Sequence, residues 1–162
     1  MQDVGLEILD WAHLGYKEAF ERQHDLVEER INGSAPDRLV LVEHPPVVTL
    51  GRSGSHEDLC ISEAALHQKG VEFYAVDRGG QATFHGPGQL VAYPIIKLAE
   101  KDLHRYLQTL LEVVAAVIGN YGFKPVFKEG RPGVWVDSKK IASVGIAVKK
   151  WVTYHGVALN VN

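Results

Sequence analysis

Polar side chains stand among glycines and prolines in the stretch RGGQATFHGPGQLVAYP, residues 78–94. Arg78, Thr83, His85 and Gln89 can all donate hydrogen bonds. The glycines allow backbone angles that are closed to other residues, so main-chain N–H groups can approach a ligand closely. The stretch therefore predicts a ligand-binding loop. The alternative is a glycine-rich hairpin without a ligand, since glycine pairs are common in turns.

Two familiar nucleotide motifs do not fit this stretch. A phosphate-binding P-loop would need Gly-Lys-Ser/Thr after its glycines, and none follows. A dinucleotide fingerprint would match at Gly86 and Gly88, but Val91 stands where the third small residue belongs. The stretch is therefore neither a P-loop nor a dinucleotide-binding fingerprint.

Small residues recur on two later segments, KIASVGIAV and HGVALNVN. If both are strands, alternation places Ser143, Gly145 and Ala147 on one face, and Gly156 and Ala158 on one face of the next. Such faces leave space above a sheet for a slender apolar chain or for a closely packed helix. We expect the loop and these two strands to border one pocket.

Lys140 opens the first of these segments, at the rim of the small-residue face. A cation there can attract a carboxylate or stabilise a thiolate. The neighbouring Lys139, Lys149 and Lys150 are interpreted as solvated surface residues. His155, which heads the last segment, is expected to form hydrogen bonds near the site.

The only cysteine is Cys60, four residues after His56. Two such residues are weak evidence for a metal, because a closed zinc site needs four ligands. Cys60 is interpreted as a free structural thiol. With one cysteine no internal disulfide can form, which favours a reducing, cytoplasmic location. The start of the chain also lacks the basic and apolar segments of a secretory signal.

Length and composition predict one domain over residues 1–162. The formal net charge of -3 argues against a nucleic-acid partner. No apolar run is long enough to cross a bilayer, so no membrane role is expected.

The hydrophobic periodicity predicts helices over residues 14–32, 62–69 and 102–121, the last capped by Asp102. Strands are expected between and after them, in the order β-α-β-β-α-β-β-α-β-β-β. This order does not alternate regularly. It favours an α/β (α+β) fold with a mixed, largely antiparallel sheet flanked by helices.

Three motifs together resemble one family. RGGQATFHGPGQLVAYP resembles the signature of the octanoyltransferases, also called lipoate–protein ligase B. LVEHPPVVTLGRSG and KKIASVGIAVKKWVTYHGVALNVN are similar to its early strand pair and to the second half of its site. The motifs agree in order and span residues 39–162. The resemblance implies the core shared by biotin ligases, lipoate ligases and class II synthetases.

By the same resemblance, the activity is transfer of an octanoyl or lipoyl group without ATP, metal or other cofactor. The donor is octanoyl acyl carrier protein. The acceptor is a lysine on a lipoyl domain of a 2-oxoacid dehydrogenase or on the glycine cleavage H protein. Lys140 aligns with the catalytic lysine. The implied substrate-binding residues are Arg78, Gly79, Gly80, Gln81, Ala82, Thr83, Phe84, His85, Ser143, Val144, Gly145, Gly156, Val157 and Ala158.

One departure from the family concerns its nucleophile. The family's cysteine lies in a Pro-Cys-Gly segment beyond the last strand, whereas this sequence stops at Asn162. We therefore expect a C-terminally incomplete catalytic domain that is inactive without that cysteine. Two alternatives stay open: an ATP-dependent lipoate or biotin-type ligase, and a non-catalytic acyl-binding module. The GPGQ that follows His85 favours the transferase over the ligase.

Overall fold

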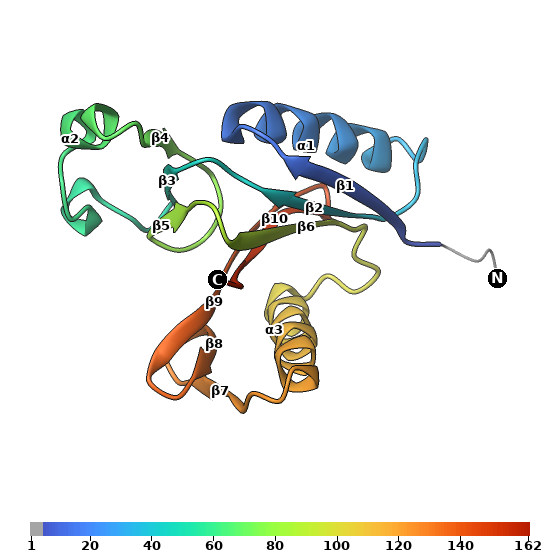
Figure 1. The fold of residues 1–162 in the computed structure, drawn as a ribbon. Coiled ribbons are helices and arrows are strands. Elements are labelled where there is room, and N and C mark those ends of the chain that lie inside the picture. The colour runs from blue at the N-terminus through green and yellow to red at the C-terminus, as the bar shows by residue number, and fades with distance from the viewer. Residues whose placement is uncertain (1–4) are drawn as a thin grey trace.

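The computed structural model describes residues 5–162. Its main element is a seven-stranded sheet (Figure 1). Its strand order is β1-β2-β6-β10-β9-β8-β7. Strands β1 and β2 pair in parallel, and every other neighbouring pair is antiparallel. The strands are β1 (Glu7–His13), β2 (Arg38–Glu43), β6 (Gln89–Ile95), β7 (Pro125–Lys128), β8 (Arg131–Val136), β9 (Lys139–Lys149) and β10 (Val152–Asn160). The mixed, largely antiparallel sheet expected from the sequence is confirmed.

A second, three-stranded sheet lies beside the first, in the order β4-β3-β5 (Figure 1). It consists of β3 (Val47–Leu50), β4 (Glu72–Ala75) and β5 (Ala82–His85). The chain passes from the large sheet to the small one after β2 and returns at β6. This detour carries the glycine-rich stretch across the gap between the sheets.

Two long helices cover opposite faces of the large sheet. Helix α1 (Tyr16–Ile31) and helix α3 (Leu103–Asn120) are the amphipathic helices expected from the sequence. Asp102 caps α3, because its side chain accepts a hydrogen bond from the Arg105 backbone N–H at 3.0 Å. The short helix α2 (Glu63–Gln68) begins in the same way after Ser62, and a 3-10 turn (His56–Asp58) precedes it.

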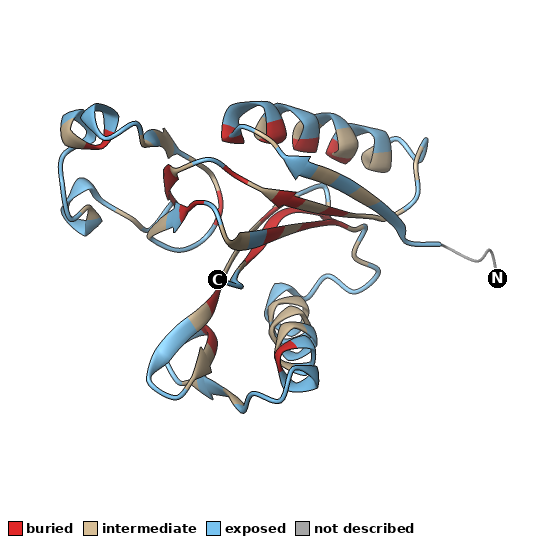
Figure 2. Ribbon diagram, in the orientation of Figure 1, coloured by how far each residue is buried: buried red, intermediate tan, exposed pale blue. Residues whose placement is uncertain are grey.

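Burial is concentrated where the helices meet the sheet (Figure 2). On the α1 side, Val27 packs against fully buried residues of β2, β6 and β10. On the α3 side, Ile118 packs against Val134, Ala142 and Val157. Each face of β10 therefore belongs to a different apolar cluster, which fixes which of its side chains point to which helix.

Two strands were not expected from the sequence. Residues 82–85, interpreted as part of a loop, form β5 and pair with β3. Residues 125–128 form β7, an edge strand next to β8. Both segments are four residues long, so local pattern alone does not distinguish them from turns. Pairing with a neighbour makes them strands.

Candidate functional site

The small residues of β9 and β10 form a strip down the middle of the large sheet. Gly145 lies opposite Gly156, and Ser143 lies opposite Ala158. A Cβ atom on Gly145 would lie 2.7 Å from the Gly79 carbonyl oxygen and 3.0 Å from Arg78 Cδ. Gly145 is therefore bare because the glycine-rich segment lies directly on it, rather than because open space stands above it.

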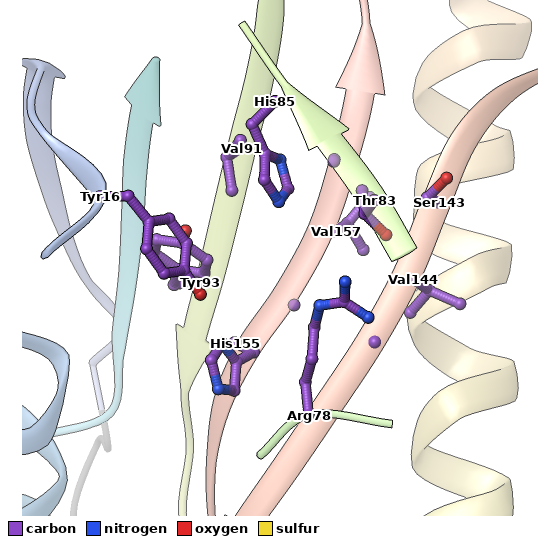
Figure 3. A pocket seen from close by; sticks show the side chains of 13 residues that line it. Tyr16, Arg78, Thr83, His85, Val91, Tyr93, Ser143, Val144, His155 and Val157 are labelled. Atoms are coloured by element: carbon purple, nitrogen blue, oxygen red, sulfur yellow. The ribbon is translucent and has the colours of Figure 1, made fainter. Parts of the chain in front are cut away.

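Arg78 lies over this strip with its guanidinium buried (7% exposed; Figure 3). Its Nη2 donates hydrogen bonds to the Thr49 carbonyl oxygen (2.9 Å), Thr49 Oγ1 (2.8 Å) and the Gln81 carbonyl oxygen (3.0 Å). All these acceptors are neutral. Burial lowers the pKa of Arg78, although a guanidinium stays charged. The site thus holds a desolvated positive charge whose hydrogen-bond partners carry no negative charge.

His85, the last residue of β5, is held as a neutral imidazole. Its Nδ1 lies 2.7 Å from Gln89 Oε1, while Gln89 Nε2 donates to the Phe84 carbonyl oxygen and to Asn160 Oδ1. Because the Gln89 amide nitrogen is used elsewhere, Nδ1 of His85 carries the proton. Burial lowers the pKa of His85 to about 4 against the opposing effect of the Gln89 hydrogen bond, and the positive charge of Arg78 acts in the same direction as burial. Its Nε2 is left as an acceptor, 3.4 Å from Thr49 Oγ1.

His155 lies on β10 in a left-handed conformation, with φ of 54°. This breaks the alternation of the strand, so Tyr154 and His155 both reach Asp77. His155 Nε2 lies 2.9 Å from Asp77 Oδ1, and the Tyr154 hydroxyl donates to Oδ2. Hydrogen bonds from His155 and Tyr154 hold the pKa of Asp77 well below its usual range. Asp77 therefore stays ionised and anchors the start of the Arg78 segment to β10.

Tyr16 and Tyr93 form the far wall of the site, and the ring of His44, which lines neither cavity, packs against both. The Tyr93 hydroxyl lies 2.8 Å from His44 Nε2, and His44 Nδ1 donates to the Leu14 carbonyl oxygen at 2.7 Å. The ring of Tyr16 stacks on His85 with centroids 6.1 Å apart. Sequence reasoning missed Tyr16, His44 and Tyr93. The available signals were a histidine at a strand end before Pro45-Pro46 and an aromatic residue at a helix start, and neither is specific.

These groups enclose a small inner cavity of about 20 Å³, with room for about one water molecule (Figure 3). Figure 3 shows Arg78 reaching into it from one side, with Tyr16, Tyr93 and His85 across from it. Its lining is Tyr16, Arg78, Thr83, His85, Val91, Tyr93, Ser143, Val144, Gly145, His155, Gly156, Val157 and Ala158.

An outer cavity of about 430 Å³ adjoins the inner one. The two share Arg78, Thr83, Ser143 and Val144. The outer lining also includes Ser53, Gly80, Gln81, Ala82, Gly130, Arg131, Pro132, Trp135 and Lys140. Lys140 is accessible to solvent, yet partial burial lowers the pKa of its ammonium.

The structure brings most of the residues singled out in the sequence to these two cavities. Gly79 and Phe84 line neither of them. Gly79 instead donates a backbone hydrogen bond to Ile146 at 3.0 Å, and Phe84 is 54% exposed with its ring over Gly86. The substrate-binding roles of the whole set stay predictions.

Cys60 lies away from both cavities. It is an exposed free thiol beside His56 and the residues that lead into α2. Among residues 5–162, no three His, Cys, Asp or Glu side chains are grouped so that they could hold a metal ion. No helix in the same range is long and apolar enough to span a bilayer.

The architecture is that of lipoate and biotin ligases. The bi-partite lipoate protein ligase of Thermoplasma acidophilum superposes with a TM-score of 0.72 at 19% identity, covering 96% of this chain and 62% of that one. The Helicobacter pylori biotin acetyl coenzyme A carboxylase synthetase with bound biotinylated ATP gives 0.57 at 12% identity, covering 96% and 61%. This confirms the expected fold class.

Sequence comparison identifies the family within that class. Residues 15–162 match the model of the lipoyl protein ligase A/B catalytic domain, so the chain belongs to this family. The octanoyltransferase of Rubrobacter xylanophilus is 48% identical over 91% of this chain and 67% of its own length. That of Syntrophotalea carbinolica is 44% identical over 96% of this chain and 72% of its own length. The resemblance to octanoyltransferases is confirmed.

Proposed function

We propose that this chain transfers an octanoyl group from acyl carrier protein to the ε-amine of a lysine on a lipoyl domain, in protein lipoylation. The observation that carries the proposal is the pair of adjoining cavities that share Arg78. Apart from the charged Arg78, the inner cavity has neutral and apolar walls suited to an acyl chain, and the outer one holds Lys140. The names of the relatives, octanoyltransferase, support the same reaction.

Arg78 is assigned to the reacting carbonyl. Its guanidinium is desolvated and held by neutral acceptors, so its charge is available to an oxygen that becomes negative. Attack on a thioester places negative charge on the carbonyl oxygen, and a preorganised donor in a site shielded from water stabilises that charge. The inner cavity has room for about one water, so entry of the acyl chain requires the Arg78 segment to shift.

The chemistry proposed is two successive exchanges at one carbonyl carbon. A cysteine thiolate forms a new C–S bond, and the C–S bond to the carrier breaks, releasing the carrier thiol after it takes a proton. The acceptor amine then forms the amide C–N bond, and the cysteine leaves as thiolate. Thioester-to-amide exchange runs downhill, so the proposal requires neither ATP nor a metal.

Lys140 is assigned to proton transfer in the second exchange. The amine that attacks must lose a proton, and a lysine whose pKa is lowered accepts one more readily near neutral pH because more of it is neutral. The nucleophilic cysteine is placed by the resemblance after the last strand. In this proposal the donor is octanoyl acyl carrier protein, and the acceptors are lipoyl domains, including the glycine cleavage H protein. The reaction takes place in the cytoplasm, and residues 1–162 belong to one catalytic domain.

The test is intact-protein mass after incubation with octanoyl acyl carrier protein, before and after hydroxylamine, which removes thioesters. A polypeptide of residues 1–162 is expected to gain no hydroxylamine-sensitive octanoyl group, because Cys60 is exposed and outside both cavities. A version extended through the relatives' Pro-Cys-Gly segment is expected to gain one and to pass it to a lipoyl domain.

Three results would contradict the proposal. An adduct on the 162-residue chain that is lost in Cys60→Ser would mean that the nucleophile is misplaced. Octanoyl adenylate formed from ATP and free octanoate would favour a ligase. Binding of the donor by the extended chain without any transfer would favour an acyl-binding module.

A further inference from the structure

The pairing of β8 with β9 is irregular beside Lys140. Val134 lies opposite Ala142, but the next residue, Trp135, lies opposite Lys140, which leaves Ile141 without a partner. One unpaired residue is a β-bulge, and it reverses the alternation of side chains along the strand. Ile141 and Ala142 accordingly both pack in the apolar cluster on the α3 side.

The bulge decides which face Lys140 occupies. By strict alternation Lys140 would share the α3 side with Ala142 and Val144, which belong to that apolar cluster. Because of the extra residue, it lies instead on the opposite face with Trp135, where both line the outer cavity. Its Nζ lies 6.0 Å from the centre of the Trp135 ring.

Gly133 is the residue of β8 over which the Lys140 side chain passes. A Cβ atom there would collide with Lys140 Cε, and would lie 2.5 Å from the Ala142 carbonyl oxygen and 3.2 Å from Lys140 Nζ. Gly133 also has a φ of 136°, which side-chain-bearing L-residues rarely adopt. The Lys140 side chain thus occupies the space that a side chain at position 133 would take.

We propose that Gly133 is a positioning residue for Lys140: its missing side chain opens the path by which the bulge directs the lysine into the outer cavity. Alanine at this position would displace the lysine stem and change the position of its ammonium in the outer cavity. The assignment of Lys140 to proton transfer rests on the proposed function, but the path across Gly133 does not.

The first test measures Lys140 itself, without acyl donor or acceptor. Competitive acetylation across a pH series, read by peptide mass, gives the pH at which Lys140 is half-labelled, with Lys139 as internal reference. In Gly133→Ala this pH is expected to rise by about 0.5–1 unit, as the displaced ammonium regains water. Gly122→Ala is the matched control: Gly122 has a φ of 84° and lines neither cavity, and no atom lies within 4 Å of its added Cβ.

Equal labelling curves in the two variants and in the unchanged chain would overturn the proposal. The kinetic counterpart uses the extended, transferring chain. Gly133→Ala is expected to lower kcat at least tenfold with little change in KM, while Gly122→Ala changes neither. If labelling shifts but kcat does not, Gly133 positions Lys140 and the role given to Lys140 in transfer is wrong.

A second variant keeps the proposal testable if Gly133→Ala is poorly folded. Lys140 Cε is the closest contact of the added methyl group, so deleting the lysine side chain removes that collision. The double variant Gly133→Ala, Lys140→Ala is therefore expected to melt about 3 °C or more above Gly133→Ala alone. A double variant that melts no higher would show that alanine acts only through backbone strain, and the proposal would fail.

Discussion

At the scale of single residues, Thr49 connects two buried polar residues of the site, Arg78 and His85. It lies on β3, is fully buried, and its Oγ1 accepts from Arg78 Nη2 while lying 3.4 Å from His85 Nε2. The sequence analysis did not single it out, since a threonine in a β-branched run is typical of any strand. Its importance comes from the neighbours that the fold gives it.

Replacing Thr49 tests this connection. Thr49→Val keeps the shape but removes the hydroxyl, leaving the Arg78 guanidinium short of one acceptor. Loss of a hydrogen bond to a charged group predicts a fall of about 1.5–3 kcal/mol in the free energy of unfolding. Thr49→Ser, which keeps the oxygen, is expected to retain most of it. Urea unfolding measures both, and equal losses for serine and valine would contradict the assignment.

At the scale of elements, β9 and the glycine-rich segment are pressed together. Gly79 donates a backbone hydrogen bond to Ile146, and Gly145 has no room for a side chain beneath Arg78 and Gly79. The small residues thus serve contact between two backbones as well as any ligand. The strip and the segment form one unit, in which a change on one side moves the other.

Gly145→Leu is expected to push the segment off β9. The added side chain overlaps the Gly79 carbonyl oxygen, and overpacking of this kind costs about 1–3 kcal/mol. Hydrogen exchange at residues 78–80 should accelerate, and octanoyl binding should be lost with it. Gly79→Ala is the control, because its Cβ would have only an ordinary contact of 3.8 Å with Ile146. Unchanged exchange in a folded Gly145→Leu variant would contradict this packing.

At the scale of the whole molecule, three buried imidazoles link stability to pH. Burial lowers the pKa values of His44, His85 and His155, so the folded protein keeps them neutral where the unfolded chain takes up protons. The unfolded state then binds more protons as the pH falls below about 6.5, and stability falls with it. For His85 this window extends down to about pH 4.

The expected loss from His85 alone is about 2 kcal/mol between pH 7 and pH 5. Urea unfolding at the two pH values measures it. In His85→Gln the difference between the two pH values should shrink by about this amount, whatever the overall stability of the variant. His104→Gln, at an exposed position on α3, should leave the difference unchanged. An unaltered pH dependence in His85→Gln would show that His85 is not the group responsible.

Local chemistry in the sequence was enough to predict much of this protein. Asp102 predicts the start of a helix because its carboxylate can accept a hydrogen bond from a free backbone N–H group in the first turn of the helix that follows. The faces on which Gly145 and Gly156 lie could be predicted because side chains alternate along a strand, but not that the glycine-rich segment fills the space above Gly145. The motif of residues 78–94 indicated the octanoyltransferase family for the same reason, because it consists of consecutive residues.

Tertiary structure alone decided the features that depend on partners distant in sequence. Alternation would have turned Lys140 away from the cavity, and only its pairing with β8 creates the bulge that turns it back. The contact of His155, in its left-handed conformation, with Asp77 and the hydrogen bond from Arg78 to Thr49 likewise depend on segments more than 25 residues away. The pattern within a strand specifies its faces, but the register against its neighbour, set by packing of the whole sheet, decides where a side chain finally points.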